Sequence, residues 1–377
     1  MPKHDSVLVT GGAGFIGSHV VDLLLQSGRT VTVVDNLDPQ VHGAERRIPA
    51  YLDRTSSIVV EDIRNKEQLA KILKNADAVI HFAATVGVGQ SMYQIERYID
   101  SNTRGTAVLL DLLVNREHKV RKLVIASSMS VYGEGKYYCD ICKSFQAPTL
   151  REIETNSKRW EHECETCLRS LKPVPTDEET PLRPASIYAM SKRHEEEMSL
   201  LVGRTYRLPT VALRFFNVYG PRQALSNPYT GTIGIFLNRI LNGKPPHIFE
   251  DGNQLRDFIH VNDVARSCLL ALEHSEADYS PVNIGTGNPI SVLQVARALI
   301  RLCGLDIEPS VSYQSRKGDV RHCYADVLRA KELLGFQANT TLTTALSELV
   351  HWAKAGTLGG SDIFEKALKE LEDKRLA

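Results

Sequence analysis

The sequence lacks any excess of charge of one sign. Among its 377 residues, 45 are Lys or Arg and 45 are Asp or Glu, so the formal net charge is zero. A chain with this balance has no overall field that would draw it to nucleic acid or to an anionic lipid surface. We therefore expect neither nucleic acid nor a membrane among its partners.

Long apolar stretches are also missing. No run of about 18 consecutive apolar residues occurs, so no transmembrane helix is expected. Met1 to Asp5 lead straight into an apolar segment without the pattern of a signal peptide. We expect a cytoplasmic protein, in which the seven cysteines are thiols or metal ligands more readily than disulfides.

A glycine-rich turn near the N-terminus has the setting of a dinucleotide site. The apolar segment Ser6 to Thr10 is followed by glycines at positions 11, 14 and 17 and then by a helical pattern. Glycines at this spacing allow a tight turn and a close approach of the backbone to a pyrophosphate at the helix N-terminus. A second apolar segment ends at Asp35, 18 residues after Gly17, where a carboxylate can bind a ribose diol. Asp35 would repel a 2′-phosphate, so the expected cofactor is NAD rather than NADP.

Further apolar segments alternate with helical patterns along the chain. Short strands are expected at 57–60, 78–82 and 122–126, and one long helix at 93–115. This rhythm predicts an α/β fold with a doubly wound parallel (Rossmann) sheet, whose ligands lie at the carboxyl ends of the strands. We expect an NAD-binding domain over 1–220 and a smaller substrate lobe over 221–377. Part of 246–285 should pack back on the first domain.

Tyr188 and Lys192 are four residues apart and would share one face of a helix. A lysine ammonium about 5–6 Å away can lower the pKa of a tyrosine, normally about 10, by roughly two units. With a nicotinamide nearby, such a pair can move the proton of a hydroxyl group. The pattern also fits an ordinary Tyr/Lys pair on a surface helix.

Several runs together resemble the extended short-chain dehydrogenase/reductases, and most of all their nucleotide-sugar epimerases and dehydratases. These runs are residues 10–17, 127–133, Tyr188-x-x-x-Lys192, 214–221, 251–261 and 318–326. The resemblance covers nearly the whole chain except about 135–173 and the last dozen residues. It implies a homodimer that associates through the helices at 93–115 and 188–206.

The resemblance also implies roles for individual residues. Ser128 matches the serine that binds the reacting hydroxyl, Tyr188 the base, and Lys192 the residue that binds the nicotinamide ribose. The expected substrate-binding residues are Ser128, Asn217, Arg256, Arg316, Arg321 and Cys323. The expected NAD-binding residues are Gly11, Gly14, Phe15, Ile16, Gly17, Asp35, Asn36, Asp62, Ile63, Phe82, Ala83, Ala84, Asn102, Tyr188, Lys192 and Phe215.

The residues after Ser128 bear on the reaction. Related 4,6-dehydratases have an Asp-Glu pair at these two positions, and sugar-nucleotide decarboxylases usually have a glutamate at the second. Here they are Met129 and Ser130. A single base working in both directions suits a 4-epimerase with retained NAD. Residues 35–43 and 220–231 resemble a branch assigned to dTDP-L-rhamnose 4-epimerases, which make dTDP-6-deoxy-L-talose. A UDP-hexose or UDP-glucuronate 4-epimerase is the alternative, and a non-catalytic dinucleotide sensor is a remote one.

An insert rich in cysteine separates Ser128 from Tyr188. The 59 residues between them contain Cys139-x-x-Cys142 and Cys164-x-x-Cys167. Two such pairs predict a closed four-thiolate zinc site in a zinc-ribbon-like module over about 136–172. His162 could replace one ligand, and disulfides or free thiols are the other readings. The polar segment between the two cysteine pairs needs a bound metal ion of this kind to become ordered.

Overall fold

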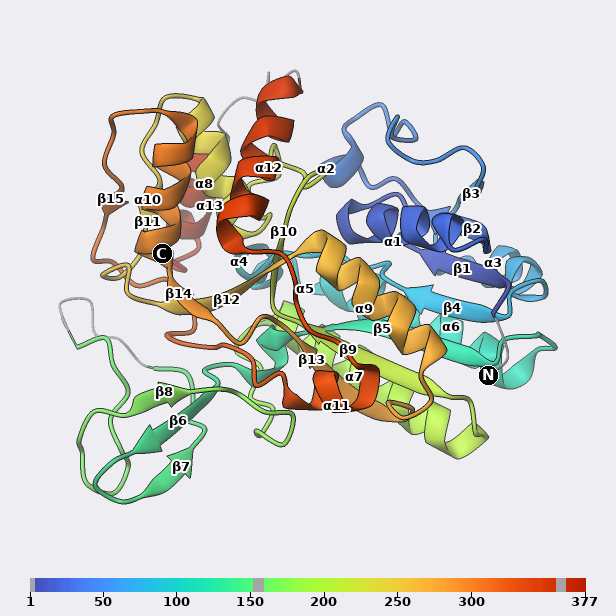
Figure 1. The fold of residues 1–377 in the computed structure, drawn as a ribbon, viewed down its shortest axis with the longest axis horizontal. Coiled ribbons are helices and arrows are strands. Elements are labelled where there is room, and N and C mark those ends of the chain that lie inside the picture. Colours follow the sequence, from blue (N-terminus) through green and yellow to red (C-terminus); the bar gives the residue numbers. More distant parts are fainter. Residues whose placement is uncertain (1–3, 152–158, 357–363) are drawn as a thin grey trace.

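The central element of the fold is a seven-stranded parallel sheet with the strand order β13-β9-β5-β4-β1-β2-β3 (Figure 1). The computed structural model describes residues 4–151, 159–356 and 364–377. The strands are β1 (Ser6–Thr10), β2 (Thr30–Asp35), β3 (Ser57–Val60), β4 (Ala78–His81), β5 (Lys122–Ser128), β9 (Thr210–Phe215) and β13 (Ser280–Ile284). The order reverses between β1 and β4, which opens a crevice at their carboxyl ends. The predicted doubly wound fold is confirmed.

Helices cover both faces of this sheet, which explains why its strands are apolar at consecutive positions. Val7 and Val9 of β1 belong to the core shared with α1 (Phe15–Gln26) and α9 (Val261–Glu273). Leu8, between them, points to the other core. That second face is covered by α3 (Lys66–Leu73), α6 (Gly105–Asn115) and α7 (Ile187–Tyr206).

The long helix predicted at 93–115 is present without a break from Ile95 to Asn115, but it is not α-helical throughout. It consists of α5 (Ile95–Tyr98), a π-helical turn (Ile99–Arg104) and α6, and the short α4 (Val88–Ser91) precedes it. The wider turn contains buried Asn102, whose Nδ2 donates to Ser191 Oγ of α7 (2.9 Å) and to Thr85 O. Such turns often occur at functional sites, and this one ties the segment after β4 to the tyrosine helix.

The C-terminal part of the chain builds a smaller lobe. Its strands are β10 (Asn217–Tyr219), β12 (Leu255–His260) and β14 (Pro289–Ser291) in one sheet, with β11 (His247–Ile248) paired to β15 (Ser310–Val311). The helices α8 (Thr232–Leu241), α10 (Val292–Cys303) and α12 (Leu342–Ala355) enclose its core. Residues 261–284 return to the large sheet as α9 and β13, and α11 (Leu328–Leu334) packs against both.

The last helix, α13 (Phe364–Asp373), packs against the rest of the molecule. Residues 363–376 are strongly charged, so the sequence alone predicts an exposed helix, and this prediction is wrong. Ala367 and Leu371 of α13 are buried, and Glu370 accepts hydrogen bonds from Tyr93 and Tyr229. Among the helices in the described ranges, none has both the length and the apolar character needed to cross a bilayer.

The insert forms a separate small sheet after the 3-10 turn η2 (Met129–Tyr132). Strands β6 (Lys136–Cys139), β7 (Ser144–Gln146) and β8 (Lys172–Val174) are antiparallel in the order β7-β6-β8. Figure 1 shows this sheet at one corner of the molecule, away from β1, β2 and β3. We call residues 136–174 the cysteine module.

Candidate active site

The glycine turn after β1 leaves no room for side chains. Gly11 has a φ of +69°, and an added Cβ would lie 2.7 Å from the backbone nitrogen of Ala83. A Cβ on Gly17 would lie 2.3 Å from Gly11 O. Helix α1 then starts at Phe15 and Ile16, with Gly14 as N-cap and no acidic residue in its first turn. Its N-terminus thus offers free N–H groups and a positive dipole end to a pyrophosphate.

Replacing Gly17 by alanine should therefore abolish NAD binding, because the new methyl group forces the helix away from Gly11. We expect the purified variant to contain less than about a tenth of the NAD of the wild type, since the required shift costs well over 1.4 kcal/mol. The cofactor released on denaturation measures this. Gly356→Ala is the control, because its Cβ would lie no closer than 3.7 Å to a neighbour. Equal NAD content in both variants would contradict the assignment.

The carboxylate at the end of β2 is fixed by the backbone. Asp35 accepts hydrogen bonds from Ala13 N (3.0 Å) and Leu37 N (2.9 Å), so it faces the glycine turn. Asn36 next to it donates to Asp62 (3.0 Å). Hydrogen bonding from Arg64 lowers the pKa of Asp62 to about 2, against the opposing effect of burial. Both carboxylates thus lie where the NAD prediction places acceptors for the ribose and adenine groups.

The remaining expected cofactor residues lie along the same crevice. Phe82, Ala83 and Ala84 follow β4, and Ala83 N donates to Thr10 Oγ1 at 3.3 Å. Phe215 ends β9 and stacks on Phe82 with ring centroids 6.3 Å apart. Ile63 is buried after β3. The fold therefore brings the predicted set to the carboxyl ends of the strands.

Ser128 and Tyr188 meet at the centre of this edge. Ser128 is the last residue of β5, and its Oγ accepts hydrogen bonds from Ser130 N (3.2 Å) and Ser130 Oγ (2.9 Å). Tyr188 lies in the first turn of α7, which Ser186 caps through Ala189 N (3.1 Å). Burial raises the pKa of Tyr188 to about 12, while a hydrogen bond with Ser128 opposes this rise. The phenol therefore needs a nearby positive charge before it can act as a base.

Lys192, one helical turn after Tyr188 on α7, is the predicted source of that charge, and it has a charged partner of its own. Its Nζ donates to Glu195 Oε2 at 2.7 Å, and both side chains are buried. The sequence interpretation missed Glu195. Its position three residues after Lys192, on the same helix face, was the available signal.

Three of the expected substrate residues lie on or beside the small sheet of β10, β12 and β14. Asn217 of β10 is in register with Phe258 of β12, and Arg256 of β12 forms a bridge with Cys323. The side-chain oxygen of Asn217 is buried and has no hydrogen-bond partner within the described residues. Arg316 forms a two-pronged pair with Asp319 (2.7 and 3.0 Å) and lies over Phe249. Cys323 has no exposed surface.

The predicted role of Arg321 in substrate binding is not supported. This side chain is 1% exposed, and its five N–H groups all donate to carboxylates. The acceptors are Glu161 of the cysteine module and Glu250 and Asp251 of the small lobe. No donor is left for a phosphate, so Arg321 instead joins the module to the lobe. We call this contact the clamp.

The four predicted zinc ligands converge. The Sγ atoms of Cys139, Cys142, Cys164 and Cys167 all lie within 4.8 Å of one another. Two of the separations are 3.5 Å (Cys139 to Cys167) and 3.7 Å (Cys142 to Cys164). Four thiolates about 2.3 Å from one zinc ion would be about 3.8 Å apart, whereas disulfide sulfurs are about 2.05 Å apart. The donor set therefore fits zinc.

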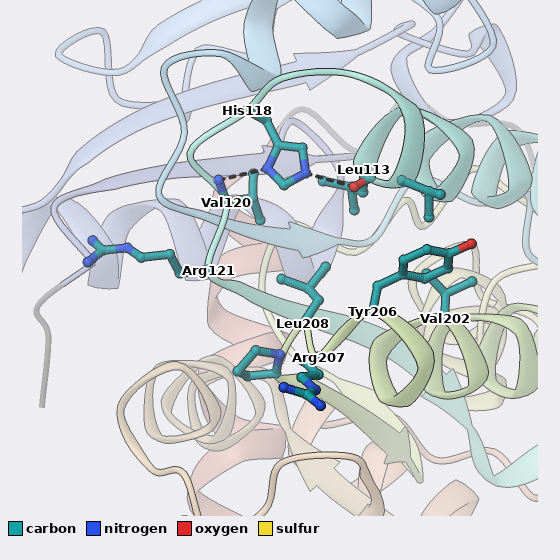
Figure 2. A pocket seen from close by; sticks show the side chains of 10 residues that line it. Leu113, His118, Val120, Arg121, Val202, Tyr206, Arg207 and Leu208 are labelled. Carbon is teal, nitrogen blue, oxygen red and sulfur yellow. Dashed lines mark hydrogen bonds between the residues drawn. The ribbon is translucent and has the colours of Figure 1, made fainter.

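One cavity of about 520 Å³ lies at the opposite end of the sheet (Figure 2). It is lined by the ends of α6 and α7 and the segments that lead into β5 and β9, including Leu113, Val202 and Tyr206. His118 spans its wall, accepting from Val120 N (3.1 Å) and contacting Leu113 O (2.8 Å). Because it lies at the amino ends of the strands, this cavity is not the nucleotide crevice.

Comparison with known proteins agrees with this geometry. The model of the NAD dependent epimerase/dehydratase family matches residues 7–155 and 167–285. The interruption, residues 156–166, falls inside the cysteine module.

Individual relatives match over nearly their full length. The dTDP-L-rhamnose 4-epimerase of Burkholderia thailandensis is 32% identical, covering 92% of this chain and 94% of its own. The UDP-glucuronate 4-epimerase of Thermodesulfobacterium geofontis is 33% identical, with coverages of 92% and 95%. The crystal structure of a UDP-glucose 4-epimerase of Thermotoga maritima with UDP-glucose has a TM-score of 0.75 at 33% identity, with coverages of 93% and 99%. The chain thus belongs to the NAD dependent epimerase/dehydratase family.

Proposed function

We propose that this protein inverts the configuration at C4 of a nucleoside-diphosphate sugar through a 4-keto intermediate. The observation that supports this most is that Ser128, Tyr188 and Lys192 lie together at the carboxyl ends of the strands. The two residues directly after Ser128 are Met129 and Ser130, and neither of them is an acid. Met129 packs into an apolar cluster and Ser130 donates to Ser128. Neither residue can remove a second proton from the sugar, as elimination would require.

Each residue of this site has its own role in the proposed reaction. Tyr188 takes the proton of the C4 hydroxyl and later returns it, and Ser128 orients that hydroxyl through its Oγ. Lys192 stabilises the Tyr188 phenolate and holds the ribose. NAD, when bound, supplies a hydride acceptor and donor at C4. Asn217, Arg256 and Arg316 hold the nucleotide and diphosphate while the keto sugar turns over, because guanidinium groups suit phosphate oxygens.

The preferred substrate is dTDP-L-rhamnose, with dTDP-6-deoxy-L-talose as the product. Residues 35–43 and 220–231 support it, as does the similarity to an enzyme of that name. UDP-hexoses and UDP-glucuronate are the alternatives, since relatives with those names match equally well. Each sugar nucleotide should be supplied separately and the C4 epimer followed by NMR. We expect turnover of dTDP-L-rhamnose to exceed that of the others by at least about tenfold, one missing polar contact being worth this much. No turnover of any of them would refute the proposal.

We further propose a structural zinc ion in the cysteine module. The converging thiols support it, as does Gln146 Nε2, which donates to Cys164 Sγ at 3.0 Å in the manner of an outer-sphere partner. Four thiolates leave no open position on the metal, so its role is structural. Purified protein should contain one zinc per chain, as elemental analysis would show.

A homodimer through α6 and α7 stays a prediction. It is supported by the exposure of Leu201 and Tyr206 on α7, at 64% and 58%. Light scattering of the purified protein tests it.

A further inference from the structure

The catalytic helix contains a buried carboxylate that the proposed mechanism does not use. Glu195 is 1% exposed, and its Oε2 lies 2.7 Å from Lys192 Nζ. Its other oxygen, Oε1, is also buried and has no hydrogen-bond partner within the described residues. A carboxylate that loses water on one oxygen and gains only one partner on the other is costly to keep ionised. We therefore expect this buried carboxylate to have a function.

The spacing on α7 places Lys192 between two partners. Tyr188 is four residues before it and Glu195 three residues after it, so the lysine side chain lies one helical turn from each. Lys192 is itself buried, so little solvent screens the three groups from one another. In the structure the ammonium contacts Glu195, and the negative charge of Glu195 opposes ionisation of Tyr188.

Other charged groups near this helix are engaged elsewhere. His81 of β4 lies near Lys192, but burial lowers its pKa to about 3, so it stays neutral between two threonine hydroxyls. Neighbouring pairs are Arg214 with Glu196, Lys122 with Asp278, Asp100 with Arg64 and Arg104, Lys66 with Asp111, Arg193 with Glu197, Tyr132 with Arg214, and Tyr98 with Gln90. The charge on Lys192 is therefore balanced by Glu195 in particular.

We propose that Glu195 is a positioning residue that holds the Lys192 ammonium and offsets its charge, so that the protonation of Glu195 sets how strongly Lys192 stabilises the Tyr188 phenolate. This inference rests on the proposed roles of Tyr188 and Lys192. It concerns neither the sugar nor the cysteine module.

The direction of the effect follows from the charges. Burial raises the pKa of Glu195 to about 7, against the attraction of Lys192. Above that pH the carboxylate is ionised, the pair with Lys192 is neutral, and the pKa of Tyr188 is higher. Below it the carboxyl is neutral, and the full charge of Lys192 acts on the phenol. Glu195 thus opposes the active phenolate least on the acid side of its own pKa.

The test is the variant Glu195→Gln, whose amide oxygen can still accept from Lys192 without adding charge. We measure the near-ultraviolet absorbance of tyrosinate against pH in NAD-bound protein and subtract the curve of Tyr188→Phe. The pKa of Tyr188 should fall by about one unit in Glu195→Gln, as expected for removing one buried charge nearby. Glu197→Gln is the matched control, because Glu197 lies on the same helix, is half exposed and pairs with Arg193.

This titration needs no sugar nucleotide, so it stands even if the proposed epimerisation is refuted. Where activity is found, the rise of kcat with pH should shift by the same amount, with an unchanged plateau. Superimposable titration curves for wild type and Glu195→Gln would overturn the proposal, and so would an equal shift in Glu197→Gln. Should Glu195→Gln fail to fold, Glu195→Asp replaces it. Its shorter carboxylate must then shift the curve in the same direction by less, and a curve identical to the wild type would overturn the proposal.

Discussion

Tyr188→Phe should lower the turnover number of epimerisation by at least about a hundredfold, the lower end of what one acid–base group contributes. The change removes one oxygen atom and leaves the ring, so packing against Tyr98 (centroids 6.4 Å apart) persists. The hydrogen bond to Ser128 and the site that receives the C4 proton are lost. NAD should remain bound, because the glycine turn and Asp35 are untouched. Turnover assays and the cofactor content of the variant measure both effects.

The control is Tyr206→Phe, the same chemical change at the far end of α7, where the side chain is 58% exposed. Its turnover should equal that of the wild type. Wild-type activity in Tyr188→Phe would contradict the assigned base. An inactive wild type that still binds NAD would favour the remote reading, a dinucleotide sensor on the same fold.

Cys139→Ser should remove the zinc ion and unfold the cysteine module. Structural zinc contributes about 10–16 kcal/mol of folding free energy in small peptides, and the module has little else. Its buried core consists of Tyr137, Cys139, Cys164 and Leu171. We expect the zinc content to fall from one per chain to below a tenth. The rest of the fold loses only its contacts with the module, so its midpoint of thermal unfolding should drop by several degrees, at roughly 2–4 °C for each kcal/mol of these contacts.

Unfolding of the cysteine module should also weaken substrate binding, because the clamp joins the module to the small lobe. Without the module, Glu161 no longer accepts from Arg321, and the segment that contains Cys323 loses one of its supports. We therefore expect KM for the sugar nucleotide to rise more than kcat falls. Cys303→Ser, at a half-buried thiol outside the cluster, is the control and should keep its zinc. A wild-type protein free of zinc under reducing conditions would contradict the site.

Much of the nucleotide crevice could be predicted because its signals are local. The strand, the glycine turn and helix α1 follow one another within residues 6–26, and Asp35 ends the next strand. The four cysteines are likewise close in sequence, and their spacing alone predicted that they meet. In each case the residues that meet lie within one short stretch of the chain.

The clamp could not be predicted, because its partners are distant in sequence. Arg321 is separated from Glu161 by 160 residues and from Glu250 by 71. In the sequence it is one more arginine beside a conspicuous motif, and its partner Glu161 lies in the interruption of the family match. Docking of α13 was missed for the same reason. Its charged surface suggested exposure, whereas Glu370 reaches Tyr93 and Tyr229 far earlier in the chain.

The backbone pairing of Thr176, just after the cysteine module, has a consequence for the order in which the chain folds during synthesis. Thr176 forms a bridge with Ala325, and Thr176 N donates to Tyr324 O at 2.8 Å. All four cysteines have been translated by residue 167, so the proposed zinc ion can bind while the ribosome is still making the small lobe. The segment that contains Ala325 is made about 150 residues later, which at 5–20 residues per second is roughly eight to thirty seconds. During that interval the nascent chain exposes Thr176, which is fully buried in the folded protein.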